Sequence, residues 1–424
     1  MRFGSGKDII TPDIKMHMGG YASIFGKYMN TIHDDLYVKT FIMQDDGNTV
    51  VLISLDLIFH DYDLTLKIGE YVQDRYQICK DNVFLTYTHN HAGPVTRGYD
   101  PAQVDPKYEA FLESRIKSCV DRAFLNMFDG EIYFSSIEGN WNINRRRKEN
   151  DVVVGGPNPL GIKDNKMNIL KICDKNNDMR ILTLNYACHP VTLGDTLDLS
   201  SEYSGRLCEI LEAEFYGSTT IFFQGAGAHE RPVITVVGNV FKKATFDETD
   251  DFANILANNI KKALYTDMPK KIDLSIKVKR FTIPLDIDPL SKDELRKRIE
   301  GNDKMVSRTS AYVLDRYDET DDVINLNAGI IQINKDIYIA YLCGEVCYEV
   351  KQVIENVFKE KLVLLFGYGD STSYIPGDKI LIEGGYESRG TVGGFCMKGR
   401  YKIGMDKRIS DAYKKNLSDM NDNQ

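Results

Sequence analysis

Apolar residues follow two different spacings along this chain. Short, almost continuously apolar segments are typical of buried strands. The clearest of them are residues 50–58, 82–85, 168–173, 180–188, 219–223 and 362–366. In other segments apolar residues recur at every third or fourth position, which predicts helices. These segments are residues 64–76, 107–127, 200–215 and 247–265. Because strands and helices alternate, we predict an α/β fold with mixed sheets and flanking helices.

Polar stretches lie between these elements and after them. Residues 1–35 are predicted to be largely irregular, and residues 300–327 to be a loop-rich excursion. The three arginines at 145–147 are expected in a solvated or salt-bridged turn. No repeat, linker or break in composition divides the chain. We therefore expect one large domain over residues 1–405, followed by a polar C-terminal tail, residues 406–424, that frays.

Composition narrows the choice of partners and compartment. The chain has 424 residues, 42% of them apolar, and a net charge of -9 with both signs interspersed. Nucleic-acid binding needs a positive face, so this charge argues against it. We expect no signal peptide, no transmembrane segment and no stable membrane insertion, because no sufficiently long apolar run occurs. Eight scattered cysteines fit reduced thiols in the cytoplasm. No feature indicates an oligomeric state.

Two histidines stand where one of the apolar strands ends. His89 and His91 follow the strand at 82–85, and Gly93-Pro94 then forces a turn. On extended backbone, residues two positions apart point the same way, so both imidazoles can face one point. Such a pair suits a metal site or acid/base chemistry. The alternative is a pair of loop histidines without a shared role, and the short pattern leaves both open.

Other strands also end in residues that carry chemistry. They are His189, the loop 224–231 with His229 and Arg231, Glu345 and Tyr374. In α/β proteins, binding sites collect outside the ends of strands. Two histidines, a carboxylate and a phenol together suit a divalent metal ion, and zinc is the usual one. The pattern does not establish that these strands end at the same edge.

Several segments, in this order along the chain, resemble motifs of the neutral, non-lysosomal ceramidase family. Met18-Gly19-Gly20-Tyr21 resembles the family's MGGY turn. Thr88-His89-Asn90-His91-Ala92-Gly93-Pro94 resembles its THTHSGP motif. Ala187-Cys188-His189-Pro190 resembles its second histidine segment, and Ser200-Ser201-Glu202-Tyr203-Ser204-Gly205 resembles SADYPG. The shared order extends along nearly the whole chain and implies the fold of the family's single catalytic domain.

The resemblance implies one zinc ion per chain and a set of site residues. The implied zinc ligands are His89, His189, Glu345 and Tyr374. A second active-site tyrosine follows twelve positions after Tyr374, as Tyr386 in a Tyr-Glu dipeptide. The resemblance also assigns the second histidine of the THTH motif to His91, and a substrate-contacting arginine to Arg145.

One motif departs from the family pattern. In the loop Ala228–Pro232, Arg231 stands where the family has its catalytic serine, and His229 replaces an aspartate. A guanidinium is neither a nucleophile nor a general base, although it can bind an anion or an oxyanion. This departure argues against ceramide itself as the substrate.

We therefore hypothesise a zinc-dependent hydrolase in which a metal-activated water attacks an amide (N-acyl) or related bond of a small polar or anionic substrate. His91 is the expected general acid/base, with His229 as a second such group or as a histidine packed in its loop. Tyr386 and Arg145 or Arg231 are expected to stabilise the oxyanion or orient the substrate. The competing hypothesis is a metal-stabilised, non-catalytic protein that binds a ligand.

Overall fold

Two β-sheets form the centre of this computed structural model, which describes residues 1–96, 103–266, 269–370, 373–389 and 395–422. The described part of the larger sheet has nine strands in the order β10-β9-β8-β5-β1-β2-β3-β4, with β14 beside β5. These strands are β1 (Arg2–Ile9), β2 (Tyr37–Gln44), β3 (Thr49–Leu55), β4 (Val83–Tyr87), β5 (Phe128–Glu138), β8 (Lys166–Asp174), β9 (Met179–Tyr186), β10 (Thr219–Gln224) and β14 (Lys270–Ile272). The pairs β3–β4 and β9–β10 are parallel.

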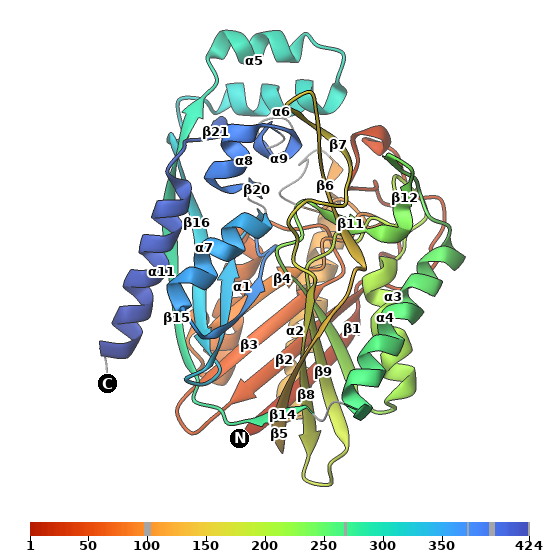
Figure 1. Ribbon diagram of the computed structural model, residues 1–424, viewed down its shortest axis with the longest axis vertical. Helices are drawn as coiled ribbons and strands as arrows, with labels where there is room; N and C mark the ends of the chain where they lie inside the picture. Colours follow the sequence, from red (N-terminus) through yellow and green to blue (C-terminus); the bar gives the residue numbers. More distant parts are fainter. Residues whose placement is uncertain (97–102, 267–268, 371–372, 390–394, 423–424) are drawn as a thin grey trace.

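The second sheet has the order β19-β17-β16-β15-β21. Its strands are β15 (Lys277–Pro289), β16 (Val323–Gln332), β17 (Ile337–Leu342), β19 (Leu362–Phe366) and β21 (Gly399–Tyr401). Three small sheets lie at one end of this pair, as Figure 1 shows. They contain β6 (Asn142–Glu149), β7 (Val152–Asn158) and β11 (Glu230–Pro232), then β12 (Val236–Val237) and β13 (Val240–Phe241), and finally β18 (Glu345–Val346) and β20 (Tyr374–Ile375).

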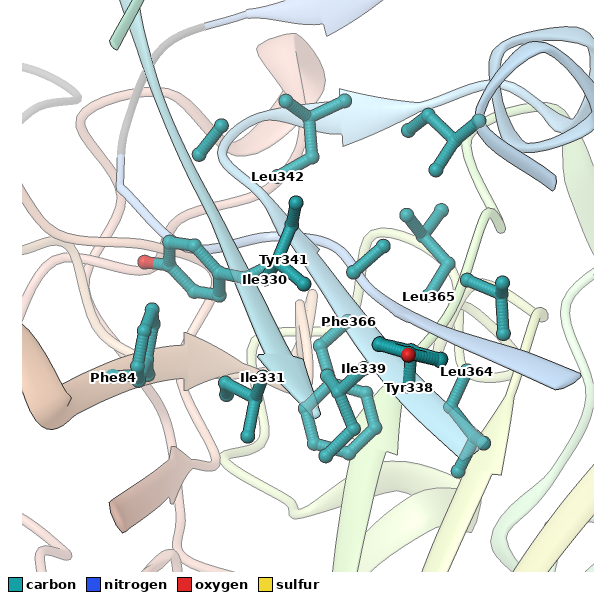
Figure 2. Close-up of a cluster of buried hydrophobic side chains, with 14 of the residues drawn as sticks. Phe84, Ile330, Ile331, Tyr338, Ile339, Tyr341, Leu342, Leu364, Leu365 and Phe366 are labelled. Atoms are coloured by element: carbon teal, nitrogen blue, oxygen red, sulfur yellow. The ribbon is translucent and has the colours of Figure 1, made fainter. Parts of the chain in front are cut away.

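The main core lies between the two large sheets. One cluster of buried apolar side chains joins them, and Figure 2 shows part of it. Phe84 of β4 meets Tyr341 of β17 at 5.0 Å between ring centroids. Phe223 of β10 stacks on Phe366 of β19 at 4.4 Å. Burial of each such ring stabilises the fold by roughly 1.5–3 kcal/mol, so the two sheets are held face to face.

Helices cover the outer faces of both sheets, which confirms the predicted α/β fold with mixed sheets and flanking helices. The main helices are α1 (Tyr62–Tyr76), α2 (Pro106–Leu125), α3 (Glu202–Glu214), α4 (Phe246–Thr266), α7 (Tyr348–Phe358) and α11 (Met405–Asp422). α1 and α2 pack on the larger sheet through a second apolar cluster, and α3 and α4 through a third. Figure 1 shows α3 and α4 on one side of the molecule and α11 on the other.

Shorter helices complete the described chain. They are α5 (Lys292–Ile299), α6 (Lys304–Asp315), α8 (Gly377–Glu383), α9 (Tyr386–Arg389) and the 3-10 turns Ala22–Ile24, Lys80–Asn82 and Val233–Thr235. α5 and α6 form a helical hairpin that connects β15 to β16 along the chain. Figure 1 shows this hairpin at the same end of the molecule as β6 and β7. No helix in the described ranges has the length and apolar character required to cross a bilayer.

Three predictions about polar stretches were wrong in whole or in part. Residues 10–35 are largely irregular, as predicted, but Arg2–Ile9 form β1, whose Gly4 and Gly6 hide its strand pattern. A Cβ on Gly4 would lie 2.2 Å from the Ala123 carbonyl oxygen, so glycine is needed for α2 to approach. The arginines at 145–147 belong to β6 rather than to a turn, and the expected loop at 300–327 contains α6 and the start of β16.

The predicted fraying tail, residues 406–424, is likewise corrected. Most of it belongs to α11, an amphipathic helix whose buried residues include Ile409, Tyr413 and Met420. These side chains join the main core, and the Tyr413 hydroxyl donates a hydrogen bond to the carbonyl of Tyr341 at 2.6 Å. Most residues of this helix are polar, because one narrow apolar stripe is enough to hold it on the sheet. Its composition therefore resembles that of a solvated tail.

Candidate metal centre and its cavity

The ends of strands from both large sheets meet at one place. The amide of Tyr87, at the end of β4, donates to the carbonyl of Tyr368, just after β19, at 2.9 Å. The amide of Gly367 donates to the carbonyl of Gln224, at the end of β10, at 3.0 Å. The amide of Gly225 donates to the carbonyl of Tyr186, at the end of β9, and the amide of Tyr368 donates to that of Gly344, after β17, both at 2.9 Å. The segments that follow β4, β9, β10 and β17 are therefore brought together, as the grouping of chemistry-bearing residues at strand ends suggested.

His89 and His189 are oriented by backbone carbonyl groups. Nδ1 of His89 lies 2.9 Å from the carbonyl oxygen of Ile58, and Nδ1 of His189 lies 2.6 Å from that of Gly227. A carbonyl oxygen only accepts, so each Nδ1 carries the hydrogen and each Nε2 is left with a lone pair. The hydrogen bond at Nδ1 fixes the orientation of each ring, as it does in histidines that bind a metal ion through the other nitrogen.

Glu345 lies opposite both free nitrogens. Its Oε2 is 3.3 Å from Nε2 of His89 and 3.1 Å from Nε2 of His189. All three side chains are buried. Burial lowers the pKa of His189 to about 4, and Glu345 opposes this shift only in part. In their neutral forms both rings present an Nε2 lone pair to a carboxylate oxygen, an arrangement that fits a bound cation.

Tyr374 is placed beside Glu345 by backbone pairing. The two residues are partners in the parallel β18–β20 pair, so their side chains leave the backbone side by side. The Tyr374 hydroxyl oxygen accepts a hydrogen bond from Nη2 of Arg145 at 3.1 Å. Tyr374 thus lies next to Glu345, and both residues line the same cavity as His89.

His91 extends this group to three histidines. Nitrogen atoms of His89, His91 and His189 all lie within 4.8 Å of one another, so these three residues alone could hold a metal ion. Within the described chain, neither ring nitrogen of His91 has a hydrogen-bond partner. Burial and the two neighbouring imidazoles lower the pKa of His91 well below its usual value. His91 is thus a neutral imidazole available for a metal ion or for proton transfer.

One carboxylate holds two arginines next to Tyr374. Oε1 of Glu387 accepts from Nε of Arg145 at 2.9 Å, and Oε2 accepts from Nη1 of Arg146 at 2.6 Å. Glu387 is 1% exposed. Burial alone would raise the pKa of Glu387, but the two arginines overcome this and lower it to about 2. Its negative charge therefore fixes the guanidinium that contacts Tyr374.

A cavity of about 950 Å³ opens above the histidines. His89, His91, Glu345 and Tyr374 line its inner end. Its walls are largely apolar and come from several parts of the chain, including Phe59, Val153, Phe241, Met305 and Phe395. Met305 belongs to α6, so the α5–α6 hairpin covers one side of the cavity. The volume is enough for a small molecule.

The remaining candidate residues occupy different positions. Tyr386 and Arg231 line the cavity, and Tyr386 is 60% exposed, which places it at the opening. His229 is fully buried, and its Nδ1 lies 3.7 Å from Oε2 of Glu349. His229 is not among the described residues that line the cavity. This placement favours a histidine packed in its loop over a second acid/base group.

Two residues of the site had no predicted role. Glu387 appears in the sequence only as the neighbour of Tyr386, and nothing in the pattern connects it with Arg145, 242 positions away. Tyr21 belongs to the MGGY segment, and its ring meets that of His91 edge-on at 5.0 Å. The motif could have pointed to Tyr21, whereas the contacts of Glu387 required the fold.

Comparison with known proteins agrees with this geometry. The family model described as neutral/alkaline non-lysosomal ceramidase, N-terminal, matches residues 2–221. The fold is similar to that of neutral ceramidase from Pseudomonas aeruginosa, with a TM-score of 0.74 and 17% identity over 99% of this chain and 73% of that one. It is equally similar to a ceramidase complexed with C2, with a TM-score of 0.74 and 16% identity over 99% and 74% of the two chains.

Proposed function

Because the chain belongs to the neutral/alkaline non-lysosomal ceramidase family, we propose that it is a zinc-dependent hydrolase of an amide (N-acyl) or related acyl bond in a small polar molecule. The observation that carries this proposal is the convergence of His89 and His189 on Glu345, with nitrogen–oxygen distances of 3.3 and 3.1 Å. Oriented imidazole and carboxylate groups at the inner end of a cavity are the usual surroundings of a catalytic zinc ion.

The proposed ligands of one zinc ion per chain are His89, His189, Glu345 and Tyr374. Two imidazoles, a carboxylate and a phenolate suit zinc better than harder cations such as magnesium or calcium. A bound zinc ion would polarise a carbonyl group and lower the pKa of a water molecule to about 7. Burial raises the pKa of Tyr374 well above its usual value, and the hydrogen bond from Arg145 opposes this rise by favouring the ionised phenol.

His91 is the proposed proton acceptor and donor. Its pKa lies well below the usual value, so the ring is neutral at pH 7 and can take a proton from the attacking water. The same ring can then return the proton to the leaving amine. Its edge-on contact with Tyr21 holds the imidazole at the cavity wall.

Arg145 and Tyr386 are proposed to orient the substrate and to stabilise negative charge on its carbonyl oxygen. The ring of Tyr386 lies 5.4 Å from that of Tyr374, at the cavity opening. Arg145 lies 5.4 Å from the Tyr386 ring and 5.6 Å from the Tyr374 ring, measured to the ring centroids. Arg231 cannot act as a nucleophile. We therefore propose that water, rather than a side chain, attacks, and that ceramide is a poor substrate.

Location remains a prediction. All eight cysteines are unpaired, which supports the expectation of a reducing compartment such as the cytoplasm.

The proposal is tested by metal-dependent turnover of simple acyl compounds. Protein stripped with a chelator is compared with protein reloaded with zinc, using 4-nitrophenyl acetate and 4-nitroacetanilide as probes. We expect turnover only after reloading, and loss of most of it in Glu345→Gln and His91→Asn. His33→Asn is the control, because His33 is a half-exposed histidine outside the cavity lining.

The outcomes separate the two hypotheses. Turnover that survives removal of the metal would contradict the proposal. Zinc bound at one ion per chain, without turnover of any acyl probe, would support the non-catalytic ligand-binding protein instead.

A further inference from the structure

Arg231 differs from the other arginines near the candidate metal centre. Arg145 and Arg146 share the carboxylate of Glu387, whereas Arg231 has no ion pair with a described carboxylate. The hydrogen bond given for its side chain is a long one, 3.4 Å from Nη2 to the carbonyl oxygen of Val191. Its Nε is buried and has no partner among the described residues.

The carboxylate that interacts electrostatically with Arg231 already accepts other hydrogen bonds. Glu202 is one of the groups that act electrostatically on Arg231. Its carboxylate, however, accepts hydrogen bonds from the amides of Thr192 and Leu193 at 3.0 and 2.9 Å. Glu202 therefore binds the backbone of the segment that follows His189 and is not the partner of the guanidinium. Burial lowers the pKa of Arg231, a sign that water has been removed from the cation without full replacement.

Arg231 stands next to the reacting end of the cavity. It lies in β11, directly after Glu230, whose carbonyl accepts from the amide of His189 at 3.0 Å. Its guanidinium packs 4.5 Å from the centroid of the Phe241 ring. Tyr21 interacts electrostatically with Arg231 and also meets the ring of His91. A group bound by Arg231 would thus be adjacent to His91.

The charges around the cavity also favour an anion. Arg145, Arg146 and Lys148 contact two carboxylates, Glu387 and Glu383, so that group keeps one net positive charge. The proposed zinc ion is neutralised by Glu345 and the phenolate of Tyr374. The charge of Arg231 is additional to these. A planar guanidinium with free N–H groups matches the paired oxygens of a carboxylate or phosphate.

We propose that Arg231, Tyr21 and Phe241 form an anion-binding subsite, and that the substrate is an amide carrying a carboxylate or phosphate-type group near the scissile bond. This inference rests on the proposed hydrolase function and specifies its substrate class. The guanidinium binds the anion, the Tyr21 hydroxyl adds a donor, and Phe241 keeps the arginine side chain in place. The arginine at the position of the family's serine thereby becomes the determinant of specificity.

The test measures binding, so that it does not depend on turnover. Three N-acetyl compounds are compared by calorimetry: N-acetylglycine, N-acetyl-aminomethylphosphonate and the uncharged N-acetylglycinamide. The protein is used both zinc-loaded and chelator-stripped, because a metal ion binds anions by itself. We expect at least one charged compound to bind about tenfold or more tightly than the amide, as charge-assisted hydrogen bonds predict.

Variants assign this preference to Arg231. Arg231→Gln is expected to reduce the preference for the charged compound about tenfold or more in both metal states, and Arg231→Lys to retain part of it. Arg180→Gln is the matched control, because Arg180 pairs with Asp174 on the surface of β9, and it should keep the full preference. If Arg231→Gln unfolds, the reduced preference in Arg231→Lys still tests the subsite.

The two proposals fail in different ways. A wild-type protein that binds all three compounds equally, or an Arg231→Gln variant that keeps the wild-type preference, would overturn the subsite. The relative strength of carboxylate and phosphonate identifies which anion the substrate carries. A preference that depends on Arg231 without turnover of any acyl probe would overturn the hydrolase and leave the subsite standing.

Discussion

Replacing Glu387 with glutamine tests whether one buried carboxylate organises the side of the site formed by Arg145 and Arg146. Glutamine has nearly the same shape but offers one acceptor oxygen, and its amide group would place N–H against N–H at one arginine. Both arginine contacts are short, 2.9 and 2.6 Å. We therefore expect Glu387→Gln to fold and to be clearly less stable than the wild type.

The magnitude follows from the pKa of Glu387, which is lowered from 4.5 to about 2. At about 1.4 kcal/mol per pKa unit, this shift corresponds to about 3 kcal/mol in favour of the ionised, paired state. An independent expectation, about 3–5 kcal/mol for removing one member of a buried ion pair, agrees with it. Unfolding entropy of about 2.1 cal/mol/K per residue converts 3 kcal/mol into a Tm decrease of about 3 °C for this chain.

The pH dependence gives the reasoning a second test. A carboxyl group with a lowered folded-state pKa stabilises the protein above its unfolded pKa, near 4.5, and loses that contribution as the pH falls through about 2. The difference between wild type and Glu387→Gln should be constant from pH 5 to 8 and should shrink below pH 4.5. Urea unfolding at several pH values, followed by circular dichroism, measures this difference.

The matched control is Glu383→Gln. Glu383 contacts Arg146 at 3.2 Å and Lys148 at 3.0 Å, but its side chain is 22% exposed. We expect a loss of less than about 1 kcal/mol for it. If Glu387→Gln is within about 1 kcal/mol of the wild type at pH 7, or if the difference grows on acidification, the assignment of Glu387 as the organising carboxylate is wrong.

Three further predictions concern other parts of the fold. Burial alone would lower the pKa of His60, but two carboxylate partners raise it to about 9. His60→Asn should therefore lower the free energy of unfolding by up to about 3 kcal/mol below pH 6.5. This loss should disappear as the pH rises through 9, as measured by urea unfolding. Gly20 has a φ of +101°, and a Cβ there would lie 2.9 Å from Nδ1 of His91; Gly20→Ala should lose at least about 1 kcal/mol of stability and reduce turnover, and unchanged values of both would refute the contact. Leu85→Ala should cost about 2–5 kcal/mol because β4 is fully buried, whereas Leu160→Ala at a 95% exposed position should change the thermal midpoint by less than about 1 °C.

The metal side of the site could be predicted because strand patterns carry it. His89 and His189 follow apolar strands directly, and such strands are recognised from their length and composition. Glu345 and Tyr374 were also recognised as residues that follow predicted strands, and the resemblance implies them as ligands. The structure supplies the reason that they meet, a short parallel pair. Pairing of two-residue strands leaves no periodic signal in the sequence.

The arginine side of the site and the cavity wall could not be predicted. Arg145 and Glu387 are far apart in the sequence, and their contact depends on how β6 and α9 meet. The α5–α6 hairpin was expected to be partly a loop, since its residues are mostly polar and only a few, among them Val313, are buried. His229 and Arg231 were both candidate site residues in the sequence, with different roles, but only Arg231 is among the described residues that line the cavity. The spacing of apolar residues along the sequence does not predict contacts between distant residues, and it predicts poorly those helices that have few apolar residues.

The most direct test of the central claim is the metal content of the purified protein. Elemental analysis after dialysis should give about one zinc ion per chain for the wild type and for His33→Ala. The content should fall to near zero in His89→Ala, His189→Ala and Glu345→Ala, while His91→Ala should retain the metal but lose turnover. Zinc lost in His91→Ala but kept in Glu345→Ala would show that the three histidines alone hold the ion. No metal in the wild type would contradict the account as a whole.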